Sequence, residues 1–340
     1  MTTTANPRWK HRPEGANWGD FGPDDQLGRL NLIGPAQVLA AVREVRDGLT
    51  FSLSLPLDVP RAGVLNPRRR PPVMHPSEKD GQRVFNRPLA GDVPGATDVI
   101  SDDHVTLSPQ YSTQWDALGH VNCLFDADGD GHAETVGYNG FSVGSGSAPD
   151  GTFMGARALS VAPMAARGIQ GRGTLVDLHR HFDTGRHAVG YDDLMRVIEA
   201  DHVDVRRGDI LCLHTGLADM ALNLSADDDH TALRGACAVL DGTDARLLRW
   251  IDDAGIAAIA ADNHAVEERR HALPPGTTGP LLPLHELCLV KLGIPLGEMW
   301  HLTPLAAWLQ QAGRASFLLT APPMHLPHAV GSPTNPMATV

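Results

Sequence analysis

The chain has 340 residues with a formal net charge of −12, and 42% of the residues are hydrophobic. This composition is typical of a globular protein, and the acidic balance argues against binding to nucleic acids or to anionic membrane surfaces. No apolar run could span a membrane, the N-terminus has no apolar signal core, and the four cysteines form no CxxC pair. We therefore expect a cytoplasmic protein with reduced cysteines.

The first part of the chain contains few regular elements. Residues 1–34 are rich in Trp, Gly, Asp and Pro, which predicts an irregular N-terminal segment. Apolar residues at helical spacing predict a helix over residues 35–45, with Pro35 in its first turn. The alternation of residues 51–55 predicts a strand.

Residues 56–100 contain much Pro, Arg and Gly, which predicts a long excursion over the surface. Long loops in compact domains often act as lids or as oligomer contacts. The densest cationic run of the chain, Arg68–Arg70, lies in this excursion, and we interpret it as a solvated or interface segment.

The second part of the chain alternates between short apolar strands and amphipathic helices. Strands are predicted at residues 174–178, 209–213, 256–260 and 316–320, and helices at residues 192–202, 244–253 and 303–312. The alternation predicts an α/β fold with a mixed sheet. Because the sequence shows no internal repeat and no linker, we expect residues 1–340 to form a single domain.

A polar stretch from Asp262 to Glu267 directly follows the buried strand predicted at residues 256–260. Polar residues at strand ends in α/β sheets commonly line a binding crevice. Asp262 and His264 are therefore candidate substrate-binding residues, with helix capping by Asp262 as the alternative.

An acidic loop begins at Asp126 with the sequence DADGDG, which resembles the start of a calcium-binding loop. The twelfth position of such a loop requires a bidentate Glu, but the residue here is Gly137. We favour an acidic turn without calcium.

The stretch QYSTQWDALGHV, which begins at Gln110, combines a carboxylate with an imidazole. In an extended chain, Gln110, Ser112, Gln114 and Asp116 lie on one face because side chains alternate. His120 lies near Asp116 if the chain turns into a helix there. A carboxylate orients an imidazole and raises its basicity, which suits a general acid or base. We therefore predict Asp116 and His120 as catalytic and the two glutamines as substrate-binding; the alternative is a polar strand edge with an Asp cap.

His285 and Glu298 flank a segment whose apolar spacing predicts a helix over residues 284–290, ended by Gly293. A helix followed by a turn can bring both ends of the segment to one site. From the spacing alone, a helix-capping His and a solvated Glu explain the pattern equally well.

These residues resemble the cyclase family that includes bacterial kynurenine formamidase and isatin hydrolase. The family signature is His-x-Gly-Thr-His-x-Asp-x-Pro-x-His; in this chain Thr113, Asp116 and His120 match it, while Gln110 and Gln114 replace the first two histidines. Further stretches extend the resemblance to the family's longer branch over most of the chain, in the family's order: residues 18–19, 24–32, 138–140, 172–177, 208–210, 214–216, 284–298 and 331–338.

The resemblance implies a swivelling β/β/α fold, a homo-oligomer and the hydrolysis of an amide or cyclic amide by metal-activated water. In the family, the first two signature histidines and the Asp hold a divalent ion, and the last His moves protons. The Asp, together with a later His and Glu, can hold a second ion. The corresponding residues of this chain are Asp116, His285 and Glu298 for the second ion, and His120 for the proton transfer.

The two glutamines change the chemistry that the resemblance implies. Imidazole nitrogen is a strong zinc ligand, whereas an amide oxygen is only weakly basic, so we expect tight zinc binding to be lost at the first position. One zinc or manganese ion could still bind to Asp116, His285 and Glu298, or no metal binds at all.

Three functional hypotheses follow from these residues. The first is a hydrolase of a small amide, cyclic imide, aryl formamide or lactone that uses His120 and one metal ion. The second is a metal-independent lyase, isomerase or cyclase that uses His120 and Asp116. The third is a binding protein without turnover. Trp115 beside the site favours an aromatic or heterocyclic small molecule, unless it belongs to the core, and the resemblance favours a homodimer or homotetramer.

Overall fold

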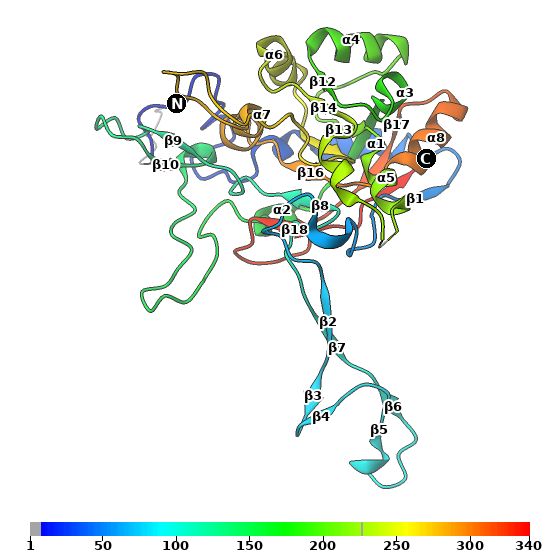
Figure 1. Ribbon diagram of the computed structural model, residues 1–340. Coiled ribbons are helices and arrows are strands. Elements are labelled where there is room, and N and C mark those ends of the chain that lie inside the picture. Colours follow the sequence, from blue (N-terminus) through cyan, green and yellow to red (C-terminus); the bar gives the residue numbers. More distant parts are fainter. Residues whose placement is uncertain (1–7, 226) are drawn as a thin grey trace.

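The computed structural model describes residues 8–225 and 227–340, so residues 1–7 of the predicted irregular segment lie outside the described residues. Its centre is a nine-stranded sheet (Figure 1). In spatial order the strands are β1 (Thr50–Ser52), β19 (Met337–Thr339), β17 (Ser316–Thr320), β11 (Gln170–Asp177), β13 (Ile210–His214), β15 (Ala258–Ala261), β16 (Leu296–Glu298), β8 (Gln114–Asp116) and β18 (Gly331–Pro333).

The sheet is mixed, as the sequence predicts. The strands β11, β13, β15 and β16 run parallel to their neighbours in this group. The strands β17 and β8 pair antiparallel at the two sides of the group. Parallel strands need a long crossover, and the helices between these strands in the sequence supply it.

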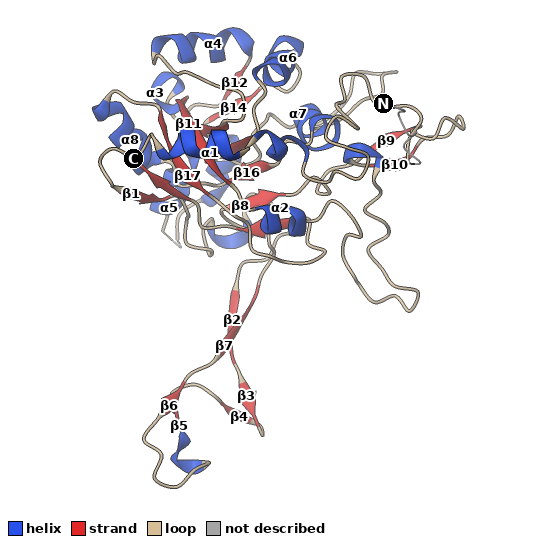
Figure 2. Cartoon of the chain, turned by 180° about the vertical axis from the view of Figure 1, so that it is seen from behind, coloured by secondary structure: helices blue, strands red, loops and turns tan. Residues whose placement is uncertain are grey.

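Helices cover both faces of the sheet (Figure 2). Leu211 and Leu213 of β13 pack into one hydrophobic core with α4 and α6, whereas Ile210 and Cys212 pack into another with α2 and α8. This alternation follows from the two-residue period of a strand. The helices are α1 (Pro35–Val42), α2 (Val161–Arg167), α3 (His179–Phe182), α4 (Tyr191–Ala200), α5 (Leu217–Asn223), α6 (Ala245–Ala254), α7 (Pro283–His285), α8 (Thr303–Ala312) and the π-helical η6 (Glu286–Leu292).

In residues 8–225 and 227–340 the structure also contains short 3₁₀ turns: η1 (Gly28–Leu32), η2 (Arg61–Gly63), η3 (Leu89–Gly91), η4 (Tyr138–Gly140) and η5 (His230–Gly235). Among the described residues, no helix is both long and apolar enough to cross a membrane.

The predicted helices and strands of the second part of the chain all form, with ends shifted by a few residues. The largest shift is at β11, which begins at Gln170 rather than at residue 174. The predicted helix at residues 35–45 is α1, which ends at Val42, and the strand predicted at residues 51–55 is the shorter β1. The predicted helix after residue 284 is α7 continued by η6, and it ends at Gly293 with a positive φ of 64°.

The excursion predicted around residues 56–100 does not simply follow the surface. Its larger part forms an arm, residues 71–108, that projects away from the body (Figure 1). Three small antiparallel ladders build the arm: β2 (Val73–Pro76) with β7 (Asp103–Thr106), β3 (Glu78–Lys79) with β4 (Gln82–Arg83), and β5 (Arg87–Pro88) with β6 (Val99–Ile100). The remaining small ladders are β9 (Cys123–Phe125) with β10 (Glu134–Val136), and β12 (His187–Val189) with β14 (Ala238–Leu240).

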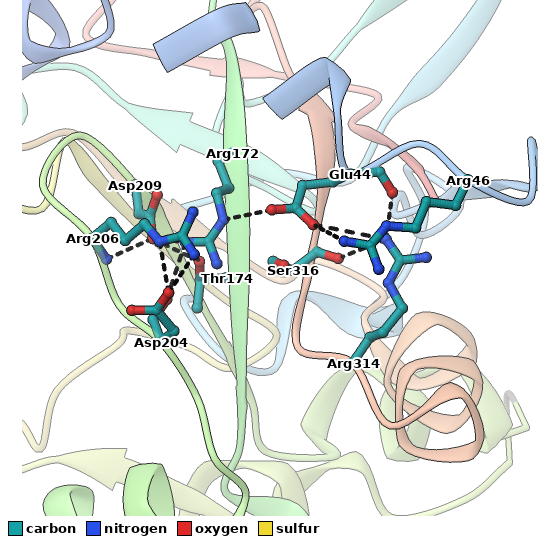
Figure 3. Close-up of polar contacts among 9 residues, drawn as sticks. All are labelled: Glu44, Arg46, Arg172, Thr174, Asp204, Arg206, Asp209, Arg314 and Ser316. Carbon is teal, nitrogen blue, oxygen red and sulfur yellow. Dashed lines mark hydrogen bonds and ion pairs between the residues drawn. The ribbon is translucent and has the colours of Figure 1, made fainter. Parts of the chain in front are cut away.

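A buried ionic network fixes one end of the central sheet (Figure 3). Arg172 of β11 donates to Glu44, just after α1, over 3.0 Å and to Asp209, just before β13, over 2.5 Å. Thr174 also donates to Asp209, over 2.8 Å. A buried guanidinium needs such partners because an unpaired buried charge is costly, so the network ties α1, β11 and β13 together.

Candidate functional site

The strand β8 sets the directions of the candidate side chains. It pairs antiparallel with β16, which places Gln114 opposite Glu298 and Asp116 opposite Leu296. Trp115, between them, faces the other side of the sheet, where it is buried in the core and its indole N–H donates to the Ala321 carbonyl over 2.7 Å. The register therefore brings Gln114, Asp116 and Glu298 to one face.

Two local expectations for this stretch are wrong. The strand covers only residues 114–116, so Gln110 lies in a preceding turn rather than on an extended strand. His120 does not begin a helix either; its N–H donates to the Ala117 carbonyl over 2.9 Å in a tight turn. The turn nevertheless returns the imidazole to the strand, because His120 Nε2 lies 3.8 Å from Asp116 Oδ2.

Asp116, His285 and Glu298 form a buried trio that could hold a metal ion. Each offers one ligand atom, and these atoms all lie within 4.8 Å of one another. Both carboxylate oxygens of Asp116 are buried without a hydrogen-bond partner among the described residues. A buried carboxylate left unsatisfied is costly, and a cation held by the trio would satisfy it, so the donor set fits a divalent ion.

Glu267 orients His285 within the trio. One Glu267 oxygen accepts from His285 Nδ1 over 2.7 Å and from the backbone N–H of His285 over 2.8 Å, while the other accepts from the Leu284 N–H over 2.9 Å. With the proton on Nδ1 engaged, Nε2 is directed at Glu298 Oε1, 3.8 Å away. A carboxylate behind a ligating imidazole is the usual arrangement at protein metal sites.

Glu298 is held from two further sides. Gln114 Nε2 donates to Glu298 Oε2 over 2.9 Å, and the Arg69 guanidinium lies 3.5 Å from the same oxygen. Burial alone would raise the pKa of Glu298, but the nearby His264, His285 and Arg69 outweigh it and lower the pKa well below its usual value. Glu298 is therefore an anion at neutral pH.

The charge balance of the trio favours a cation. Burial works to lower the pKa of His285, but its contacts with Glu267 and Glu298 outweigh burial and raise it to about 10. Burial raises the pKa of Asp116. The cluster thus retains a proton on His285. A divalent ion held by the trio would take the place of that proton as the positive charge beside the carboxylates.

Gln110 positions His120 from the side opposite Asp116. Its Nε2 lies 3.0 Å from His120 Nδ1. The side chain of Gln110 fits there because residue 331 is a glycine: a Cβ atom on Gly331 would lie 2.4 Å from Gln110 Cγ. His120 is thereby held between an amide and a carboxylate.

A cavity of about 540 Å³ opens onto the trio. His120, His264, Glu267, His285 and Glu298 line it, and the volume is in the range of small-molecule sites. Burial lowers the pKa of His264, and the nearby Glu298 opposes this effect. Of the predicted site residues, the structure brings Gln110, Gln114, Asp116, His120, His264, His285 and Glu298 together.

Asp262 and Trp115 do not take part in this arrangement. The Asp262 carboxylate accepts from the N–H and hydroxyl of Thr215 and from the N–H of Gly216, each over 2.7 Å, and does not line the cavity. Its contacts hold the chain that leads into α5 rather than a ligand. Trp115 belongs to the core on the other face of the sheet.

Two residues of the site, Arg69 and Glu267, are not among those predicted from the sequence. Arg69 belongs to the cationic run interpreted as a solvated or interface segment, but its side chain is only 15% exposed and contacts Glu298. Glu267 ends the polar stretch that begins at Asp262, and its position after a buried strand was the available signal. Arg69 had no local signal, because its partners are Glu298 and the Gln110 carbonyl, which accepts from it over 2.8 Å.

The acidic loop at Asp126, Asp128 and Asp130 also places three carboxylates within 4.8 Å of one another. These carboxylates accept from backbone N–H groups of their own loop, at 2.7–3.1 Å. These backbone contacts hold the three carboxylates in a tight turn.

Comparison with known proteins identifies a family and solved structures of the same fold. The cyclase family model, described as "Putative cyclase", matches residues 51–268. A crystal structure described as a novel cyclase is 30% identical, with a TM-score of 0.75, and the match covers 96% of this chain and 97% of that one. No curated protein matches the chain by sequence.

Two isatin hydrolase structures share the fold at lower identity. Isatin hydrolase A from Labrenzia aggregata, bound to benzyl benzoate, is 17% identical with a TM-score of 0.52, and the match covers 90% of this chain and 98% of that one. An isatin hydrolase bound to the product analogue thioisatinate is 16% identical with a TM-score of 0.52, over 90% and 95% of the two chains.

Proposed function

The chain belongs to the cyclase family, and we propose that it hydrolyses a C–N bond in a small amide, cyclic imide or aryl formamide, or the ester bond of a related lactone. The observation that supports this most directly is the buried trio of Asp116, His285 and Glu298, with the unpartnered Asp116 carboxylate next to His120. A ligand set, an acid/base group and a cavity then meet at one place.

The proposed substrate is aromatic or heterocyclic. The two isatin hydrolases that share the fold bind benzyl benzoate and thioisatinate, which both contain an aromatic ring. The cavity of about 540 Å³ has room for one ring with substituents. Trp115 no longer supports this choice, because it lies in the core.

One divalent ion, zinc or manganese, would be held by Asp116, His285 and Glu298. When bound, it supplies a Lewis acid that polarises the substrate carbonyl and lowers the pKa of water. His120 takes a proton from the attacking water and returns it to the departing nitrogen. Gln110 keeps the His120 ring in place during both transfers, and Glu267 fixes the direction of His285.

A combined metal and activity assay tests this proposal. Metal content is measured in the purified protein, and hydrolysis of formanilide, isatin and a lactone is followed before and after chelation. Activity that disappears on chelation, returns with zinc or manganese and is lost in His120→Ala supports the proposal. His132→Ala, at an exposed histidine in the acidic loop, is the matched control. Activity that survives complete metal removal contradicts the metal mechanism.

A metal-independent lyase, isomerase or cyclase is the second candidate. Two observations favour it: Gln110 and Gln114 stand where the family signature has histidines, and burial raises the pKa of Asp116 beside His120. Asp116 and His120 would then act as an acid/base pair. Turnover in metal-free protein that requires both Asp116 and His120 would support this candidate, whereas ligand binding without turnover would support a silent binding protein.

We further propose that the arm carries a homodimer or homotetramer contact. The arm exposes Val73, Met74, Phe85 and Val105 by 43–61%. A two-stranded ladder is marginally stable alone, and a second copy of the chain would cover these exposed apolar side chains. The two ends of the arm lie close in sequence to Arg69 and Gln110, whose contact belongs to the site. A second copy bound to the arm would therefore stabilise the position of these two residues.

Light scattering of the wild type and of a Met74→Asp/Phe85→Asp variant tests the oligomer contact. Dissociation to monomers is expected for the arm variant. Leu124→Asp, which replaces a residue that is 76% exposed in β9, should leave the assembly intact. A wild-type monomer would contradict this proposal.

A further inference from the structure

The wall of the cavity is cationic in a chain whose net charge is −12. Five arginines line it: Arg68, Arg69, Arg186, Arg234 and Arg269. They come from four separate stretches of the chain, so folding gathers them at the site. Within the part of the chain that the structure describes, three carboxylates line the same cavity, those of Glu267, Glu268 and Glu298.

The carboxylates of the cavity are already engaged. Glu267 accepts from His285, Glu268 pairs with Arg186 at 2.7 Å, and Glu298 lies 3.5 Å from Arg69. None of them is left to balance a further arginine.

Three of the five arginines have no carboxylate within 4.0 Å among the described residues: Arg68, Arg234 and Arg269. Arg234 donates through Nε to the Val64 carbonyl over 2.8 Å. This bond anchors its side chain at the wall and leaves its two terminal amino groups for another acceptor. A guanidinium presents a planar fork of donors that matches a carboxylate.

We infer that the substrate carries a carboxylate and that Arg234 and Arg269 bind it. The amide bond that is cleaved then faces His120. This inference rests on the proposed function and names the substrate class: an N-acylated amino acid or aminobenzoate. Hydrolysis would break the C–N bond, with the hydroxyl of water added to the acyl carbon and its proton to the nitrogen. The products are an amino carboxylate and a second carboxylic acid.

The cationic wall of the cavity contrasts with the negative net charge of the whole chain. An acidic protein repels anions over most of its surface, and a cationic cavity focuses them onto one place. A neutral imide or formamide would form no ion pair with the guanidinium groups that lack a carboxylate partner. The arginines therefore discriminate between substrates of the same shape and different charge.

Two matched formamides test the inference: N-formylanthranilate, which carries a carboxylate, and formanilide, which does not. We expect kcat/KM to be about tenfold or more higher for the anion, as one well-placed charged contact supplies. In Arg234→Gln and Arg269→Gln this ratio should fall toward one, chiefly through KM for the anion, and added salt should have the same effect. Arg246→Gln, at an exposed arginine of α6 that pairs with Asp192, is the control and should keep the ratio. A ratio near one in the wild type would overturn the inference.

Binding measurements separate this inference from the proposed function. Calorimetry with anthranilate and its neutral isostere 2-aminobenzamide is carried out in the wild type and in the two arginine variants. Arginine-dependent preference for anthranilate without hydrolysis of either formamide would support the cationic site and refute the hydrolase. Hydrolysis of both formamides, with equal binding of the two isosteres, would support the hydrolase and refute the inference.

Discussion

Gln110 Nε2 lies 3.0 Å from His120 Nδ1, and the other ring nitrogen of His120 faces Asp116 Oδ2 at 3.8 Å. An amide can donate to Nδ1 of a neutral ring or, after a half-turn, accept from Nδ1–H. Gln110 is therefore compatible with both protonation states that an acid/base group must visit. A histidine in its place, as in the family signature, would have to exchange its own proton to do the same.

Replacing Gln110 should affect the rate through His120. We expect Gln110→Leu to lower kcat about 10- to 100-fold, the range for groups that orient a reactive imidazole. Gln110→Glu should restore most of the rate and move the acidic limb of the pH–kcat profile to higher pH, since a carboxylate stabilises the protonated ring. Gln82→Leu, at an exposed position of the arm, is the control. An unshifted profile in Gln110→Glu would show that the amide has only a packing role.

Glu267 should control metal affinity without being a ligand. Because it fixes the His285 ring through Nδ1 and two backbone N–H groups, we expect Glu267→Gln to weaken zinc binding about 10- to 100-fold. Competition with a chromogenic chelator measures the change. Glu286→Gln, which removes only a half-buried pair with Lys291, should bind zinc like the wild type. Equal affinities in all three proteins would exclude the orienting role.

Metal binding should depend on pH because His285 must lose a proton to become a ligand. Its pKa is about 10 in the cluster without an ion, so the ring is protonated at neutral pH. The apparent zinc affinity should therefore rise about tenfold per pH unit between about pH 6.5 and pH 9, with about one proton released per ion. Calorimetry in two buffers of different ionisation enthalpy counts the protons. An affinity that stays constant over this range would contradict the assignment of His285 as a ligand.

The network around Arg172 should govern stability and leave the site chemistry unchanged. Asp209→Ala removes one partner of a guanidinium whose side chain is only 7% exposed. We expect a loss of about 3 kcal/mol in the free energy of unfolding, at the lower end of the cost of breaking a buried ion pair, because Glu44 still faces the guanidinium. Asp192→Ala breaks the exposed pair with Arg246 and should cost less than about 1 kcal/mol. Urea unfolding of both variants measures these losses. A similarly small loss of unfolding free energy in each variant would contradict a stabilising role of the network.

The helices and strands of the second part of the chain could be predicted because their apolar patterns are local. The pairing of Asp116 with His120 was also visible from a spacing of four residues, although a turn rather than a helix produces it. The sequence itself also argues against the prediction that Trp115 binds the substrate. If Gln114 and Asp116 share one face of a strand, the residue between them faces the other, where Trp115 is found in the core.

Other parts of the site depend on contacts between distant stretches, which no local pattern encodes. Arg69 reaches Glu298 across 229 positions of sequence, and Glu267 meets His285 only after the chain has passed through the loop at residues 268–282. The carboxylate of Asp262 looked equally suited to a ligand, but the N–H groups that it binds belong to Thr215 and Gly216 on the neighbouring strand's exit.

The two glutamines are the clearest departure from the family signature, and restoring them should change the metal content. Gln114 has one partner, Glu298, for its Nε2, while its Oε1 is buried without a partner among the described residues. An imidazole at this position would add a stronger ligand beside Asp116 and Glu298. We expect Gln114→His to bind zinc at least about tenfold more tightly, and Gln110→His/Gln114→His to take up a second ion per chain. Elemental analysis and chelator competition measure both. Unchanged zinc content in the double variant would mean that these positions do not correspond to the family's first metal site.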